Sequence, residues 1–167
     1  PEMRRLRRFG STGKRQDNMY TFQSQVRYSE LDSDMRLSIA SIVDYFQDCS
    51  TFHSEELGVG IEYLERVGML WVMSYWQIVI DRYPKLCEKI TVGTFPYEFK
   101  GFLGYRNFFM EDESGEKIVR ANSIWTLMDV RAGRPARPTQ EMMEAYRLEE
   151  KLDMDYEPRK IRFEQAG

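Results

Sequence analysis

The chain has 167 residues, of which 42% are hydrophobic and 31% charged, and it carries a net charge of −3. This length gives room for one domain, and this composition supplies a buried core with too little net charge for general disorder. No apolar run approaches the roughly 18 residues that a membrane-spanning helix requires, and the first residues lack the apolar stretch of a secretion signal. We therefore expect one globular domain in the cytoplasm, with no membrane partner.

Cysteine and histidine are scarce. Cys49 and Cys87 are too few for a disulfide scaffold, and the single histidine, His53, leaves no Cys/His cluster with zinc-site spacing. No metal is therefore expected. Because the sequence places no histidine where it could activate either cysteine as a nucleophile, we interpret both as small packed residues.

Residues 1–18 differ in composition from the rest of the chain. They hold six basic and two acidic residues, a balance of +4, which leaves −7 for the remainder. The segment is poor in apolar residues and stops just before Met19, so we interpret it as a basic flexible extension. Two explanations stay open: a tail that binds an anionic partner, or an upstream extension of the reading frame with Met19 as the natural start. Because the basic run is short, we expect no nucleic-acid partner.

The first elements follow from periodicity. Apolar and polar residues alternate from Tyr20 to Tyr28, which predicts a half-buried strand. A long amphipathic helix is predicted next, with Ser38 as N-cap and Gly58 as the stop. Its apolar face is formed by Ile39, Ile42, Val43, Phe46, Cys49, His53 and Leu57, and its polar face by Ser41, Asp44, Asp48, Thr51 and Glu55.

A short helical turn at 61–67 precedes a strand predicted at 69–82, which is rich in tryptophan, tyrosine and β-branched residues. The first half of this strand is apolar on both faces, which is typical of a central strand covered twice. The two faces are formed by Leu70 and Val72 and by Trp71 and Met73.

Three further strands are predicted at 89–99, 102–111 and 117–129, and the polar residues 112–116 predict a hairpin between the last two. A helical segment is predicted at 139–152, ahead of a charged tail.

The order is therefore one strand, one long helix, and four strands in an antiparallel meander. One helix can be buried among five strands only if the sheet curls around it. This predicts an α+β hot-dog fold, a curved antiparallel five-stranded sheet wrapped around one long central helix, over residues 19–138. Residues 139–167 are then a helical segment and a connector. Because such a sheet leaves an unpaired edge, we expect a homodimer or a second hot-dog repeat.

The stretch from Arg27 to Pro84, with LGVG after the helix and the strand WVMSYWQIVIDRYP, closely resembles the N-terminal half of bacterial acyl-ACP thioesterases. The resemblance extends from about Tyr20 to Arg162. That family carries two hot-dog repeats in one chain. The resemblance implies hydrolysis of the thioester between a fatty acyl chain and acyl carrier protein, which ends chain elongation in fatty acid synthesis, with acyl carrier protein as partner and no cofactor.

The sequence departs from the family pattern at one motif. The family's second repeat carries DxNxH, whose aspartate, asparagine and histidine serve catalysis, and no such motif occurs here. The matching place reads Asp32-Ser33-Asp34-Met35-Arg36, with Asp34 in place of asparagine and Arg36 in place of histidine. We therefore expect the chain to be the N-terminal substrate-pocket repeat, inactive without the catalytic repeat. The alternative is a non-catalytic hot-dog module that binds acyl chains or acyl-thioesters.

Three acids are candidate catalytic residues: Asp32, Asp34 and Asp48. Thioester hydrolysis requires a carboxylate and hydrogen-bond donors, and a loop before a helix N-terminus supplies both. Asp32 and Asp34 either activate water there or cap the helix. Asp48 corresponds by resemblance to the region where single-repeat hot-dog thioesterases place a carboxylate. His53 falls on the apolar helix face, so we expect a packed histidine with satisfied ring nitrogens.

An acyl chain requires an apolar channel, because each buried methylene contributes about 0.8 kcal/mol, and methionines adapt to variable chain lengths. The candidate acyl-binding residues are Met69, Trp71, Met73, Tyr75, Phe95 and Phe108. Acyl carrier protein is acidic as a class, so its docking requires a local basic patch on this acidic domain. The candidates for that patch are Arg82, Lys85, Lys89, Lys100, Arg106, Arg131, Arg134 and Arg137.

Overall fold

The structure is a computed structural model and describes residues 18–157. The elements in chain order are β1 (Tyr20–Gln25), η1 (Tyr28–Glu30), α1 (Ile39–Glu56), α2 (Ile61–Val67), β2 (Met69–Ile80), β3 (Lys89–Lys100), β4 (Leu103–Glu111), β5 (Lys117–Asp129), β6 (Arg134–Pro135) and α3 (Gln140–Ala145). No helix in this part of the chain is long and apolar enough to cross a bilayer.

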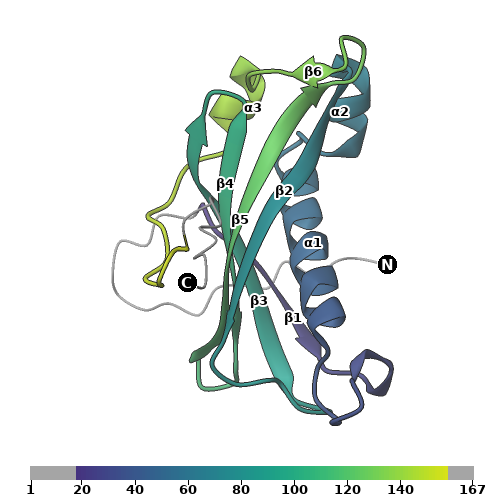
Figure 1. Ribbon diagram of the computed structural model, residues 1–167, viewed down its shortest axis with the longest axis vertical. Helices are drawn as coiled ribbons and strands as arrows, with labels where there is room; N and C mark the ends of the chain where they lie inside the picture. Colours follow the sequence, from purple (N-terminus) through teal and green to yellow (C-terminus); the bar gives the residue numbers. More distant parts are fainter. Residues whose placement is uncertain (1–17, 158–167) are drawn as a thin grey trace, which may run out of the picture.

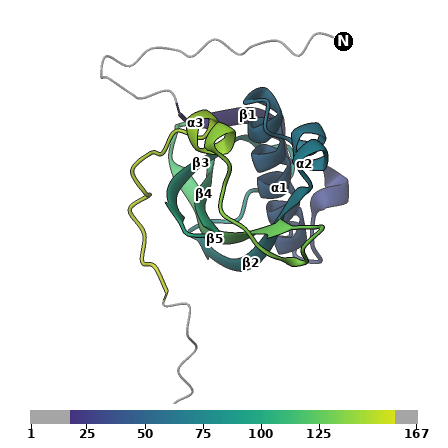
Figure 2. The same cartoon turned by 90° about the horizontal axis from the view of Figure 1, so that it is seen from above.

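One antiparallel sheet holds the described strands in the order β1-β3-β4-β5-β2, with the two-residue β6 paired to β5. The strands twist past one another beside α1 (Figure 1), and seen from above they form an arc whose open side α1 occupies (Figure 2). The concave face of the sheet and the apolar face of the helix therefore bury each other. The predicted hot-dog fold is confirmed.

Local signals in the sequence determine the ends of α1. The Ser38 hydroxyl accepts a hydrogen bond from the backbone N–H of Ser41 at 3.1 Å, which caps the first turn. After the last turn Gly58 adopts φ +76°, a left-handed conformation that favours glycine. Residues spaced three or four apart turn one face of α1 into the core: Ile42, Phe46, Cys49 and His53. The cap, the stop and these four buried residues agree with the prediction, whereas Ile39, predicted on the same face, is 55% exposed.

The predicted hairpin between β4 and β5 is also confirmed. The backbone N–H of Asp112 donates to the carbonyl of Glu116 at 2.9 Å and so closes the turn. The Asp112 carboxylate accepts hydrogen bonds from the backbone N–H groups of Ser114 and Glu116, at 2.9 and 3.1 Å. Short-range hydrogen bonds of this kind explain why the sequence located the turn correctly.

The expectation that residues 69–82 form a central strand is wrong, and so is the meander of four consecutive strands. β2 lies at one edge of the sheet, antiparallel to β5 from Met69 opposite Asp129 to Ile80 opposite Val119, and does not pair with β3. Leu70 and Val72 are 51% and 44% exposed, so the described residues do not cover the strand on both faces. Strand pairing joins residues far apart in the chain, and apolar content alone does not identify the partner.

Two elements are also shorter in the structure than the sequence predicted. β1 ends at Gln25, and Tyr28 begins the short turn η1. The helical segment expected at 139–152 is the six-residue α3, and the backbone of Tyr146 leaves the helical region with ψ 100°. The basic extension lies outside the described residues, apart from Asn18, and the end of the connector, from residue 158 on, lies outside them as well.

Candidate functional site

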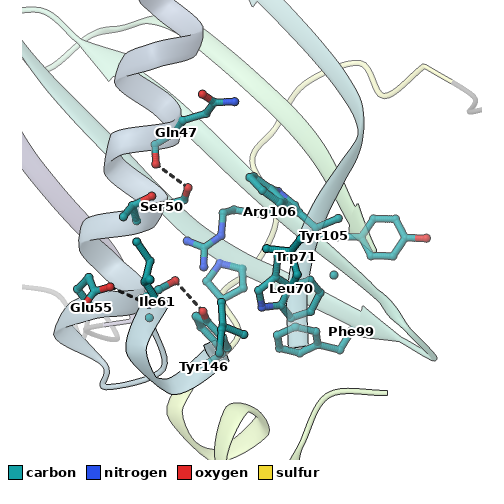
Figure 3. A pocket seen from close by; sticks show the side chains of 17 residues that line it. Gln47, Ser50, Glu55, Ile61, Leu70, Trp71, Phe99, Tyr105, Arg106 and Tyr146 are labelled. Atoms are coloured by element: carbon teal, nitrogen blue, oxygen red, sulfur yellow. Dashed lines mark hydrogen bonds between the residues drawn. The ribbon is translucent and has the colours of Figure 1, made fainter. Parts of the chain in front are cut away.

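A cavity of about 350 Å³ lies between the C-terminal half of α1 and the concave face of the sheet (Figure 3). Its walls come from six elements, from Gly60 just before α2, and from Tyr146, which follows α3. The helix ends and strand order described above therefore bring together segments that are far apart in the sequence. The described residues contain no group of His, Cys, Asp and Glu side chains arranged to hold a metal ion.

One wall of the cavity is aromatic. Trp71 of β2 and Phe99 of β3 pack with ring centroids 6.2 Å apart. A Cβ atom at Gly104 would lie 3.2 Å from the Trp71 ring, so glycine at this position allows the indole to lie against β4. The other apolar residues of the lining are Ile61, Leu64, Leu70, Pro96 and Trp125. This wall suits an aliphatic ligand.

The facing wall is a polar stripe on α1. Gln47, Ser50, Thr51 and Ser54 occupy positions i, i+3, i+4 and i+7, so their side chains share one helix face. The Ser50 hydroxyl donates to the carbonyl of Gln47 at 2.9 Å, and the hydroxyls of Ser54 and Tyr146 lie 2.6 Å apart. Part of the helix face that the sequence marked as polar therefore borders the cavity.

Arg106 contributes a buried positive charge to the cavity wall. Its side chain is 8% exposed, and the structure gives it no ion pair with a described carboxylate. Nη1 donates to Nδ1 of His53 at 3.0 Å and to the hydroxyl of Thr94 at 3.1 Å, while the guanidinium carbon lies 5.6 Å from the centre of the Tyr146 ring. Burial lowers the pKa of Arg106, yet a guanidinium remains charged in proteins.

His53 is held neutral by its burial and by the charge of Arg106. A guanidinium can only donate, so Nδ1 of His53 must accept and the ring proton resides on Nε2. Burial, assisted by the charge of Arg106, lowers the pKa of His53 to about 3. A histidine this weakly basic suits the packed role expected from the sequence. Burial also raises the pKa of the Cys49 thiol, so Cys49 is not poised as a thiolate.

The three candidate catalytic acids lie outside the cavity lining. Asp32 and Asp34 precede α1, whereas the cavity borders its C-terminal half. Desolvation would raise the pKa of Asp32, but hydrogen bonds from the backbone N–H groups of Arg36 and Asp34 outweigh it and lower the pKa. Asp32 therefore orders its own loop, with an ion pair to Arg36 at 3.4 Å. Asp48 is an exposed residue of α1. Catalysis by these acids stays a prediction.

The structure places one of the six candidate acyl-binding residues in the cavity wall. Trp71 lines the cavity, and the other five do not. Phe95 and Phe108 are almost completely buried, and Phe108 packs against Phe46 with ring centroids 5.1 Å apart. Met69 packs in a smaller cluster around Leu127, while Met73 and Tyr75 are half-buried residues of β2. A role for these five in acyl binding stays a prediction.

Two cavity-lining residues, Arg106 and Tyr146, were predicted from the sequence to lie elsewhere. Arg106 was predicted to belong to an exposed docking patch, which its burial contradicts. Alternation along β4 contained the correct signal, because Arg106, Phe108 and Met110 are two residues apart and so share the buried face. Tyr146 was placed within a longer helix, and no pattern in the sequence indicated its contact with Ser54.

A curled sheet around a single helix, with an apolar cavity between them, is the architecture of a hot-dog thioesterase domain. The family model for the acyl-ACP thioesterase N-terminal domain matches residues 17–146. The chain therefore belongs to the acyl-ACP thioesterase family, as the resemblance around LGVG and the strand after it predicted.

Curated relatives agree with this assignment. The chain is 30% identical over 127 residues to an acyl-[acyl-carrier-protein] hydrolase, FATB3, of Cuphea viscosissima, a match that covers 71% of this chain and 31% of the relative. It is 26% identical over 123 residues to a palmitoyl-acyl carrier protein thioesterase of Gossypium hirsutum, covering 68% and 30%. The chain thus spans about a third of the length of these relatives.

Solved structures give the same result. An acyl-ACP thioesterase of Bacteroides thetaiotaomicron superposes with a TM-score of 0.79 and 26% identity, covering 87% of this chain and 59% of that one. A 12:0-ACP thioesterase of Umbellularia californica superposes with a TM-score of 0.72 at 20% identity, covering 93% and 63%, and supports the fold.

Proposed function

We propose that this chain is the acyl-binding repeat of an acyl-ACP thioesterase, an enzyme that hydrolyses the thioester between a fatty acyl chain and acyl carrier protein. The observation that carries the proposal is the cavity beside α1, with Trp71 and Phe99 on its apolar wall. Relatives named as acyl-ACP hydrolases support hydrolysis over a module that only binds acyl groups. Burial of methylenes against the aromatic wall would supply the binding free energy.

The catalytic motif is proposed to reside in a second repeat. The sequence contains no DxNxH, and Arg36 occupies the place of the motif's histidine in this repeat. His53 is buried and weakly basic, so it does not replace that imidazole. This division of roles assigns acyl binding to the present chain and bond cleavage to its partner repeat.

The partner is proposed to be a second hot-dog repeat or a second copy of this chain. β1 and β2 are the two ends of the described sheet, and each leaves one edge without a paired strand in residues 18–157. Val72 of β2 is exposed and lies outside the cavity lining, so it adds apolar surface that a partner would cover. Acyl carrier protein is the proposed macromolecular substrate, and location in the cytoplasm stays a prediction.

Hydrolysis of acyl-ACP by the 167-residue chain alone should be compared with hydrolysis by the same chain joined to a DxNxH-bearing second repeat. We expect turnover only in the joined protein. As a control, the joined protein with the motif aspartate changed to asparagine should lose activity. Robust hydrolysis by the chain alone would contradict the division of roles, and no hydrolysis in the joined protein would contradict the proposed function.

A further inference from the structure

The guanidinium of Arg106 is only partly used by the protein. Nη1 donates to His53 and Thr94, whereas Nε and Nη2 donate to no group in the described part of the chain. No fully buried side-chain nitrogen or oxygen in that part lacks a hydrogen-bond partner, so Nε and Nη2 must border open space. Arg106 lines the cavity, and Figure 3 shows its guanidinium between α1 and the aromatic wall. The free edge of the guanidinium therefore faces the cavity.

The positive charge on this edge has no acid to balance it. His53 is neutral, because its Nδ1 accepts from Arg106. Glu55 is the other charged lining residue, and its Oε1 accepts a hydrogen bond from the backbone N–H of Ile61 and forms no ion pair with Arg106. Buried charges in proteins are normally paired. The cavity thus presents an uncompensated cation on its inner wall.

The geometry of the free edge selects among ligands. Nε–H and Nη2–H are parallel donors in a fixed plane, and they match the two oxygens of one carboxylate. A saturated hydrocarbon tail placed there would remove water from both donors and offer no acceptor in return, which is unfavourable. A carboxylate would satisfy both donors and balance the charge.

We propose that the cavity takes acyl groups that carry a carboxylate on the part of the chain that reaches Arg106. The inference rests on the proposed function, because it takes this cavity as the acyl site. The aromatic wall formed by Trp71 and Phe99 holds the methylenes, and the free edge of Arg106 binds the carboxylate. The same chemistry could come from a free fatty acid that enters carboxylate first, so the test includes that source.

The test is calorimetry on the full 167-residue chain with three probes of matched length. Two are nonhydrolysable pantetheine thioethers whose alkyl chains end in a methyl group or a carboxylate, and the third is the free fatty acid. We expect the carboxylate thioether to bind about tenfold or more tightly than the methyl thioether, because charge-assisted bidentate hydrogen bonds are strong. Arg106→Met should remove this preference, and Arg106→Lys should reduce it. Arg27→Met, an exposed change outside the cavity lining, should preserve it.

Equal or tighter binding of the methyl thioether to the unmodified chain would overturn the inference and leave the proposed function supported. A preference that survives Arg106→Met would also overturn it. If the free fatty acid binds tightly and the carboxylate thioether binds weakly, Nε and Nη2 of Arg106 bind the fatty acid released by hydrolysis. That result would contradict the proposal that the substrates carry a carboxylate on the acyl chain. If no probe binds, both the inference and the acyl-binding function fail. Should Arg106→Met not fold, the unmodified chain and Arg106→Lys decide the outcome.

Discussion

Nη1 of Arg106 donates to Nδ1 of His53 across 3.0 Å, which joins a residue of β4 to the only histidine of the chain. The bond requires a neutral imidazole, since Arg106 supplies the proton and His53 the lone pair. The core between α1 and the sheet thus contains the charged guanidinium of Arg106 and the imidazole of His53, which must remain neutral.

We predict a pH dependence of stability that arises from His53. Its pKa in the folded chain is lowered to about 3, against an ordinary value of 6.5. Between these values the unfolded chain binds a proton that the folded chain excludes. The contribution of His53 to the free energy of unfolding is therefore complete above pH 6.5 and decreases as the pH falls toward 3. The slope approaches about 1.4 kcal/mol per pH unit.

Denaturant unfolding of the unmodified chain and of His53→Gln, measured across that pH range, tests this prediction. Glutamine can still accept from Arg106 but does not titrate, so the difference between the two stability curves should vary with pH. Parallel curves would mean that His53 does not couple to folding.

Phe108 distinguishes packing from ligand binding. It is fully buried against Phe46 and Trp76. Phe108→Ala should reduce the free energy of unfolding by about 3–5 kcal/mol, because it leaves a cavity in the core. The matched control, Phe102→Ala, removes a ring that is 44% exposed and should cost much less. Similar losses for the two variants would contradict the assignment of Phe108 to the core.

Gly104 controls the width of the cavity. A Cβ atom there would contact the rings of Trp71 and Phe99 at 3.2 and 3.3 Å, so alanine requires a small adjustment and valine a larger one. Binding of an alkyl pantetheine thioether should weaken from glycine to alanine to valine. Calorimetry measures the series, and equal affinity in all three proteins would place the ligand elsewhere.

Asp32 is predicted to order a loop. Its carboxylate accepts from the backbone N–H groups of Asp34 and Arg36, at 2.8 and 3.3 Å. Asp32→Ala should lower the melting temperature more than Asp32→Asn, since the amide oxygen can still accept both bonds. Full kcat/KM in Asp32→Asn, measured in a protein joined to a catalytic repeat, would clear Asp32 of a catalytic role. A large loss of kcat with an unchanged melting temperature would assign it one.

The sequence predicted those features that local chemistry controls. Ser38 and Gly58 mark the ends of α1, and Asp112 closes the hairpin before β5, because caps and turns depend on neighbouring residues. The edge position of β2 was missed because strand pairing is long-range. The burial of Arg106 was predictable from the alternation along β4, but its contact with Tyr146 was missed for the same reason as the position of β2, since it exists only once the segment after α3 meets β4.

The central claim is that the cavity beside α1 holds the acyl chain, and a crystal structure with a bromoalkyl pantetheine thioether tests it most directly. The anomalous signal of bromine locates the alkyl chain without assumptions about its path. We predict a bromine peak inside the cavity, beside Trp71 and Phe99. A peak outside the cavity, with Trp71 and Phe99 untouched by the ligand, would contradict the claim.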